Sequence, residues 1–347
     1  MTVGIENSSF VDARLARTTR RFLLPQSDIN MRVPDTVRKC VLTLGCEDEC
    51  TREIVYGGTA FVVTIPGRSR EWNAPYLVTA KHSLQKIGDR RTIFRANSKS
   101  GEAVEIDATG AKWFFHPDPV VDLAIIPFLP SLELDLDVRS VSESMFLTAE
   151  DIAKHRIGPG DEVFMTGLFT KVKGHSKNLP IVRMGTVALI PDEQIPFDDN
   201  LIDAYLVEAR SIGGLSGSPA FVSETVQMAY PSKLGKKYPE EADIYFVPGK
   251  TFFMGLVIGH WDVPPSLSLL EKEKVNMGIS VVVPCWKIRE LLYLPEHVKM
   301  RKEAEKLAMD EEGISSADFV APEKKEKPFT RSDFEAALKK VSRKKDK

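Results

Sequence analysis

The chain has 347 residues, of which 43% are hydrophobic and 28% are charged, and its formal net charge is −2. This length is sufficient for one large or two small domains with a sizeable core. A charge close to zero argues against electrostatic binding of nucleic acid, and the absence of a long apolar run in the sequence argues against a membrane span. We therefore expect neither nucleic acid nor a membrane as a partner.

Residues 1–32 are polar and rich in arginine without clear periodicity, and they predict a flexible N-terminal leader. They contain no apolar segment typical of a secretory signal, and Glu6 and Asp12 argue against a transit peptide. We therefore expect a cytoplasmic protein whose four cysteines are unpaired. No paired CxxC motif or histidine cluster is present, so the sequence predicts no metal site and no cofactor.

Short β-branched or aromatic runs, separated by Gly, Pro, Asn and Asp, begin after residue 33. The predicted strands are Cys40–Leu44, Ile54–Ile65, Tyr76–Thr79, Arg91–Arg95, Ala111–Phe115 and Leu123–Phe128. Between the third and fourth of these, Ala80–Leu84 is expected to form a short helical turn that carries His82. Short strands at regular spacing are typical of an all-β barrel or sandwich.

A polar segment, residues 130–157, is predicted to connect two domains, and Thr148–Asp151 has the spacing of a capping box before a short helix. A second set of strands follows at Gly160–Met165, Leu179–Ile190, Ala204–Val207, Ser218–Val222, Phe252–Ile258 and Ile279–Val283. The duplication fits two packed barrels with a site between them, because clefts between domains commonly hold such sites. A closing helix is expected at about 286–297.

Residues 298–347 are predicted to form a charged extension that ends in a short helix. Ser332–Glu335 has the pattern of a capping box, and Phe334, Ala337, Leu338 and Val341 share one face of the helix that would follow. Two interpretations remain open. The helix is either solvated and marginal, or it is a docking peptide that folds on a protein partner.

Three stretches contain residues suited to nucleophilic catalysis. Gly214–Pro219 reads GLSGSP and places Ser216 on a turn between glycines, while LVTAKH ends in His82 and DLAII begins with Asp122. A serine hydroxyl becomes a strong nucleophile when a histidine takes its proton, and the histidine needs a carboxylate to hold its tautomer. The same turn can direct the backbone N–H groups of Gly214 and Ser216 at one oxyanion.

Together with GTAFVV at residues 58–63, these stretches resemble the chymotrypsin/trypsin-like serine peptidases, and most closely their short-loop bacterial and intracellular members. The order His, Asp, Ser and the gaps between the three motifs also suit that family. The resemblance covers residues 33–294. It implies two six-stranded antiparallel β-barrels with the active site between them, in a peptidase domain spanning 33–297. The first barrel would occupy about 33–130 and the second about 158–285.

The resemblance implies a serine endopeptidase that works through an acyl-enzyme. His82 would be the base, Asp122 would orient it, Ser216 would attack, and the N–H groups of Gly214 and Ser216 would form the oxyanion hole. The substrate would be a protein or a peptide. The alternative is a catalytically weak or inactive peptidase-like module that binds a protein partner.

Three positions depart from the family pattern. Leu215 replaces the acid that, in secreted members, pairs with a newly freed N-terminus, so we expect activity without zymogen cleavage. Ser218 replaces a glycine, and Ile258 occupies a position where a serine often supports the aspartate.

The specificity pocket is less readable. By resemblance, Arg210 lies at the pocket base and would favour an acidic P1 residue, although it equally fits a solvent-facing side chain or a partner of Glu208. Gly259, His260 and Trp261 would form the walls. A second histidine near the predicted aspartate, His116, is interpreted as a structural loop residue rather than a second base, because His82 lies in the better motif.

Overall fold

The structure, a computed structural model, describes residues 2–4, 33–68, 72–172, 174–209, 214–224, 227–229, 245–247, 250–263 and 275–312. Most of the predicted leader and the whole predicted C-terminal helix lie outside these ranges. The two interpretations of that helix, and the protein partner expected for it, therefore stay predictions.

The first half of the chain forms one nine-stranded sheet. Its strands are β1 (Thr2–Gly4), β2 (Val41–Glu47), β3 (Ile54–Pro66), β4 (Asn73–Thr79), β5 (Thr92–Asn97), β6 (Ala103–Asp107), β7 (Phe114–Phe115), β8 (Ala124–Pro127) and β9 (Val141–Ser142). They pair in the order β1-β6-β5-β2-β3-β4-β8-β7, with β9 added to β3. All pairs are antiparallel except β1–β6 and β3–β9.

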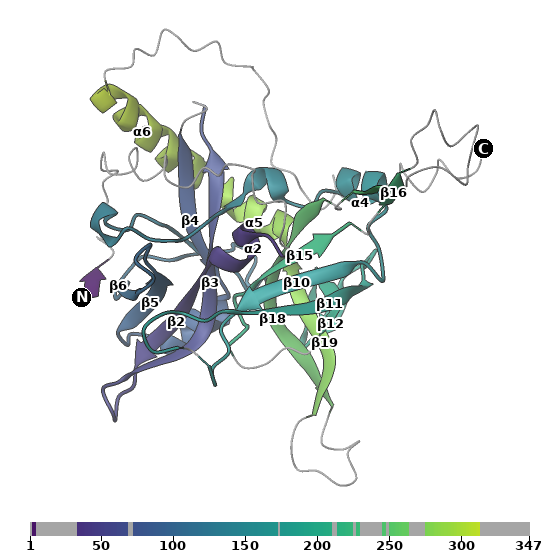
Figure 1. Ribbon diagram of the computed structural model, residues 1–347, viewed down its shortest axis with the longest axis horizontal. Helices are drawn as coiled ribbons and strands as arrows, with labels where there is room; N and C mark the ends of the chain where they lie inside the picture. The colour runs from purple at the N-terminus through teal and green to yellow at the C-terminus, as the bar shows by residue number, and fades with distance from the viewer. Residues whose placement is uncertain are drawn as a thin grey trace, which may run out of the picture.

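The second half forms a closed six-stranded barrel in the order β10-β11-β14-β19-β18-β15. Its strands are β10 (Glu162–Gly167), β11 (Ile181–Leu189), β14 (Tyr205–Glu208), β15 (Pro219–Ser223), β18 (Thr251–Val263) and β19 (Val275–Pro284). Two small hairpins are attached, β12 (Ile195–Phe197) with β13 (Asn200–Ile202) and β16 (Gln227–Ala229) with β17 (Tyr245–Val247). Figure 1 shows the first sheet and the barrel side by side, in agreement with the predicted all-β fold of two units. The first unit differs from the expected six-stranded antiparallel barrel, because it has nine strands and includes two parallel pairs.

The core lies inside the first sheet and continues between the two halves. Strand β3 explains how, because all residues from Gly58 to Ile65 are buried, so both of its faces are covered. One face joins Leu42, Leu77 and Phe94 inside the first sheet. The other face carries Phe61, whose ring centroid lies 5.4 Å from that of Phe253 in the second barrel. Burial of a phenylalanine contributes about 2–3 kcal/mol, so this contact holds the two halves together.

The helices within the described ranges that connect and cover the sheets are α2 (Asp35–Lys39), α3 (Lys81–Ile87), α4 (Ala149–His155), α5 (Cys285–Leu292) and α6 (Pro295–Glu312). Short 3-10 helices occupy Leu132–Leu134 and Glu143–Met145. The predicted capping box is present, since the Thr148 side chain accepts from Asp151 N at 3.0 Å while Asp151 accepts from Thr148 N at 3.3 Å. No helix in the described ranges is both long and apolar enough to cross a membrane.

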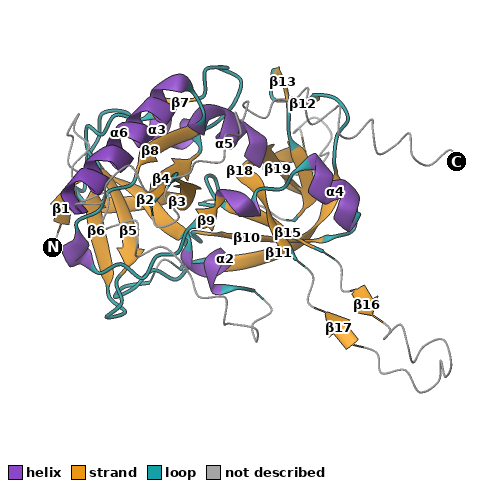
Figure 2. Cartoon of the chain, turned by 90° about the horizontal axis from the view of Figure 1, so that it is seen from above, coloured by secondary structure: helices purple, strands orange, loops and turns teal. Residues whose placement is uncertain are grey.

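The single closing helix expected at about 286–297 is wrong, because α5 ends at Leu292 and α6 begins anew at Pro295. Proline lacks the N–H that a continuing helix needs but suits the first helical turn. Helix α6 then returns to the first sheet (Figure 2), where Arg301 Nη1 donates to the Tyr76 hydroxyl at 3.3 Å. His297, which belongs to α6, is fully buried, with its ring centroid 4.5 Å from that of Phe114.

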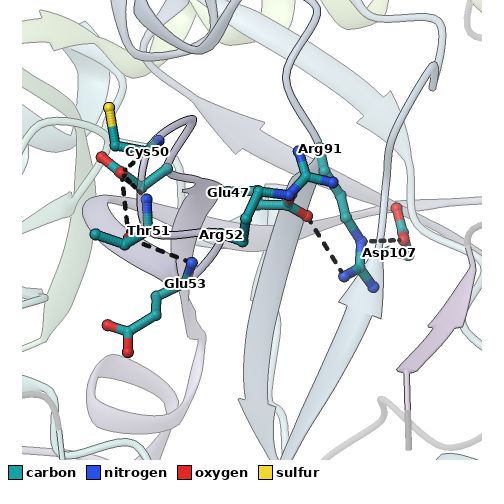
Figure 3. Close-up of polar contacts among 8 residues, drawn as sticks. Glu47, Cys50, Thr51, Arg52, Glu53, Arg91 and Asp107 are labelled. Atoms are coloured by element: carbon teal, nitrogen blue, oxygen red, sulfur yellow. Dashed lines mark hydrogen bonds and ion pairs between the residues drawn. The ribbon is translucent and has the colours of Figure 1, made fainter.

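Polar contacts close the turn between β2 and β3 (Figure 3). The Asp48 carboxylate accepts hydrogen bonds from Cys50 N at 3.0 Å and from Thr51 N at 2.9 Å, and these bonds lower the pKa of Asp48. At the base of the turn, Arg91 Nε lies 3.0 Å from Asp107 Oδ2 and so joins β5 to β6. The sequence did not predict β6, because its alternating acidic residues read as a loop.

Candidate active site

His82 and Asp122 come together because their strands are neighbours. His82 is the second residue of α3, which begins two residues after β4 ends, and Asp122 lies two residues before the start of β8. Strands β4 and β8 pair with Thr79 opposite Ala124, so the two segments leave the sheet at the same place. His82 Nδ1 lies 2.5 Å from Asp122 Oδ2, and His82 N donates to Asp122 Oδ1 at 2.8 Å. The carboxylate therefore holds both the ring and the backbone of one residue.

This arrangement fixes the chemistry of the imidazole. A carboxylate at Nδ1 favours the tautomer with its proton on that nitrogen, which leaves Nε2 free to accept a proton. The side chains of His82 and Asp122 are 28% and 17% exposed, so Asp122 is the more sheltered of the two. The pair has the geometry of a general base and its orienting group.

Ser216 lies on a tight turn that only glycine permits at its next residue. Gly217 has φ +90°, and a Cβ at this position would lie 1.9 Å from the Thr59 carbonyl oxygen. The turn is further fixed by Gly217 N, which donates to Val257 O at 2.9 Å, and by Ser218 N, which donates to Leu215 O at 2.9 Å. A side chain at residue 217 would thus push the serine loop away from the first sheet.

The backbone of Thr59 contacts both the serine loop and the strand that leads to His82. Its backbone N donates to Ser216 O at 3.0 Å, and its carbonyl accepts from Thr79 Oγ1 at 2.8 Å. Thr79 stands three residues before His82, so these hydrogen bonds connect the backbone of Ser216 to the end of the strand that precedes His82. No hydrogen bond is present between the described residues Ser216 and His82 themselves, and His82 Nε2 instead lies 3.5 Å from Ser83 Oγ. Catalytic hydrogen bonds are often long in the absence of substrate.

The backbone donors expected to bind an oxyanion are unused. Among the described residues, no hydrogen bond involves the N–H of Gly214 or of Ser216. Gly214 has φ +100°, and a Cβ there would lie 2.9 Å from the Leu168 carbonyl oxygen. Two unpaired N–H groups, one of them on a residue in the left-handed region, meet the requirement for preorganised donors.

The three departures from the family pattern have simple structural contexts. Leu215 is fully buried, so apolar packing holds this position instead of an ion pair with a free N-terminus. Ser218 is also fully buried, next to Gly167, whose missing side chain leaves room for the hydroxyl. Ile258 is 8% exposed and offers no donor, but both Asp122 oxygens already accept from His82.

The predicted pocket is only partly described. Arg210 lies outside the described residues, while Gly259, His260 and Trp261 all lie on β18. The Trp261 ring meets Phe197 of the β12–β13 hairpin edge to face, with centroids 5.4 Å apart. Sequence reasoning missed Phe197, because the hairpin is short and nothing in its sequence indicates which strand it covers.

His116 is tied to the fold rather than to the predicted base. Its Nδ1 accepts from Asp118 N at 3.2 Å, and its Nε2 lies 3.3 Å from Glu290 Oε2 on α5. Burial alone would raise the pKa of Glu290, but the hydrogen bond from His116 and the nearby Lys287 outweigh it and lower that pKa. These contacts support the interpretation of His116 as a structural residue.

Comparison with known proteins gives fold-level likenesses. No family model matches the sequence, and no curated protein matches it. The structure is similar to the MamO protease domain from Magnetospirillum magneticum, with 16% identity, a TM-score of 0.43, and coverage of 73% of this chain and 95% of that one.

Two further likenesses are of the same kind. One is the active form of the Rv3671c protease from M. tuberculosis, with 13% identity, a TM-score of 0.39, and coverage of 77% of this chain and 86% of that one. The other is the tobacco vein mottling virus protease, with 12% identity, a TM-score of 0.37, and coverage of 74% of this chain and 81% of that one. The fold is defined by the strand order, a nine-stranded sheet beside a closed six-stranded barrel, and not by these likenesses.

Proposed function

We propose that the protein is a serine endopeptidase whose catalytic residues are Ser216, His82 and Asp122. The observation that carries the proposal is the pair of hydrogen bonds between Asp122 and His82, one to the ring at Nδ1 and one from the backbone N–H, beside a serine loop docked on Thr59. A buried turn with unused N–H donors and a histidine held by a carboxylate are the parts that acyl transfer requires.

In the proposed reaction, His82 Nε2 takes the proton of the Ser216 hydroxyl as its oxygen attacks the carbonyl carbon of the scissile peptide bond. The oxyanion accepts from Gly214 N and Ser216 N, and one such donor is worth about 3 kcal/mol of the barrier. His82 then gives the proton to the leaving amine, and Asp122 stabilises the charged ring meanwhile. Water, activated by the same nitrogen, hydrolyses the acyl-enzyme and restores Ser216.

The substrate strand is proposed to lie along Gly259, His260 and Trp261 of β18. Gly259 has no side chain, and the Phe197 ring lies beside it, 3.2 Å from where a Cβ would stand, so the paired rings of Phe197 and Trp261 supply an apolar wall at this strand. Arg210 at the pocket base, with its preference for an acidic P1 residue, stays a prediction. Since Leu215 cannot form an ion pair, we also propose that the chain acts without zymogen cleavage.

The second candidate is a peptidase-like module that only binds a protein. The contacts of Asp122 favour the enzyme, because a binding surface gives no reason for one carboxylate to bond both the ring and the backbone N–H of a histidine. The alternative predicts that the serine has no unusual reactivity.

The experiment is labelling of the purified protein with a fluorescent fluorophosphonate. We expect the wild type to be labelled, and Ser216→Ala and His82→Ala to remain unlabelled. Ser144→Ala is the matched control, since Ser144 is an exposed serine on a 3-10 helix, and it should label like the wild type. An unlabelled wild type, or equal labelling of Ser216→Ala, would refute the proposed enzyme and leave the binding module.

A further inference from the structure

The hydroxyl of Thr59 connects three segments that are far apart in the sequence. Thr59 Oγ1 donates to Gly214 O at 2.7 Å and accepts from Leu168 N at 2.9 Å. Thr59 itself is fully buried. A threonine hydroxyl has one proton to donate, so the carbonyl of Gly214 takes it and the N–H of Leu168 uses a lone pair.

These bonds fix the peptide planes around the proposed oxyanion hole. Gly214 O belongs to the plane before Leu215, and Ser216 O, which accepts from Thr59 N, belongs to the plane after Ser216. The plane that carries the Ser216 N–H lies between them. Thr59 therefore holds both planes that flank this donor, and a rotation that turned the donor away would have to break at least one of its bonds.

Leu168 extends this support to the other side of the loop. Its N–H is held by Thr59, and its carbonyl oxygen would lie 2.9 Å from a Cβ on Gly214. Gly214 is thus enclosed between the hydroxyl of the first sheet and the chain that leaves β10. The second oxyanion donor, Gly214 N, is carried by a residue with little freedom to move.

The serine loop has no charged group at the position where an ion pair would lock it. Leu215 is fully buried and apolar. The conformation of the loop must then be held by neutral hydrogen bonds. The Thr59 side chain, on the first sheet, makes one of them by donating to Gly214 O.

We propose that Thr59 is a positioning residue that keeps the oxyanion loop assembled in the unprocessed chain. Its hydroxyl does the work that an ion pair at residue 215 would otherwise do. This inference rests on the proposed peptidase function, because it concerns the donors of the same site. It assigns Thr59 no contact with the substrate.

The test compares labelling rates with a fluorophosphonate, whose phosphonyl oxygen must enter the oxyanion hole. Thr59→Val keeps the shape of the side chain and removes the hydroxyl, while Thr59→Ser keeps the hydroxyl. Thr64→Val is the matched control, since Thr64 lies on the same strand and is buried, and among the described residues its hydroxyl bonds to that of Ser140 at 3.1 Å, away from the serine loop. We expect Thr59→Val to be labelled about 100-fold more slowly, a loss comparable to that of one oxyanion donor. Thr59→Ser and Thr64→Val should stay close to the wild-type rate.

A second measurement separates positioning from general damage. The low-field proton resonance of the His82–Asp122 hydrogen bond should be unchanged in Thr59→Val, because that bond does not involve the serine loop. If Thr59→Val does not fold, Thr59→Cys replaces it, since a thiol is a much weaker hydrogen-bonding group, and it must be labelled more slowly than Thr59→Ser.

The outcomes are distinct. An unlabelled wild type removes the proposed function and this inference with it. If the wild type is labelled and Thr59→Val is labelled at the same rate, the proposed role of the hydroxyl is overturned and the peptidase proposal stands. The same holds if Thr59→Ser folds but is labelled slowly. Loss of the His82–Asp122 resonance in Thr59→Val would show a general disturbance and would also overturn the inference.

Discussion

Gly167 is the position where one methyl group should disturb the site most selectively. An added Cβ would lie 2.0 Å from Ser218 Oγ, 2.8 Å from Thr59 Oγ1 and 3.0 Å from Leu215 Cδ2. All three neighbours are buried, so none can move into solvent. Forcing a methyl group into a packed core costs about 1–3 kcal/mol. We therefore expect Gly167→Ala to lower the free energy of unfolding by about 2 kcal/mol and to slow fluorophosphonate labelling.

A second substitution tests whether the Ser218 hydroxyl is the cause. That hydroxyl has no hydrogen-bond partner among the described residues, so Ser218→Gly removes the closest atom without breaking a bond. Urea titration of the wild type, both single variants and the double variant gives the coupling free energy, which should favour the double variant by about 1 kcal/mol. Gly57→Ala is the control, since a Cβ there meets no atom within 4 Å. Strict additivity of the two substitutions would refute the contact as the cause.

Three other predictions follow from buried contacts. Asn178→Ala removes the amide that bonds Arg95, and it should lower the free energy of unfolding by about 3 kcal/mol in urea titration, because buried polar groups lose their partners; a change below about 1 kcal/mol would contradict this. Burial lowers the pKa of His297 in the folded protein, so this residue is protonated at a higher pH in the unfolded chain than in the folded one. The melting temperature should therefore fall as the pH drops below about 6.5, the ordinary pKa of histidine. His297→Phe should lose part of that pH dependence, and an identical pH profile would be the contrary result. Gly217→Ala should abolish labelling, since its φ of +90° alone costs about 1–2 kcal/mol and the Cβ strikes Thr59; a normal labelling rate would count against the described turn.

The sequence predicted strands correctly where an uninterrupted run of apolar residues marks a buried strand. The long apolar run of β3 and the short one of β8 were placed within a residue or two, because burial demands apolar side chains there. Strand β6 was missed because Glu105 and Asp107 interrupt its apolar pattern and its pairing with β5 decides its structure. The break between α5 and α6 was missed although Pro295 marks it, because the flanking apolar residues suit one continuous helix.

The sequence indicated which residues belong to the candidate site, but not the contacts that hold them in place. The motifs that contain His82, Asp122 and Ser216 are local, so the sequence alone indicated all three. The role of Thr59 was not readable, although GTAF includes it, because its hydroxyl partners lie 109 and 155 residues away. Contacts at that separation depend on how two sheets dock, and no short pattern encodes them.

The bonds around the serine turn have a consequence for biosynthesis. Ser218 O accepts from Val257 N at 2.8 Å, and Gly217 N donates to Val257 O, so a strand made some forty residues later completes the turn. Domains generally fold from the N-terminus during synthesis. His82 and Asp122 can therefore pair while the chain is still on the ribosome, whereas the turn that contains Ser216 lacks its two bonds to Val257 until β18 has emerged. With this order of assembly, the nascent chain would withhold the proposed nucleophile from neighbouring proteins until the second barrel is nearly finished.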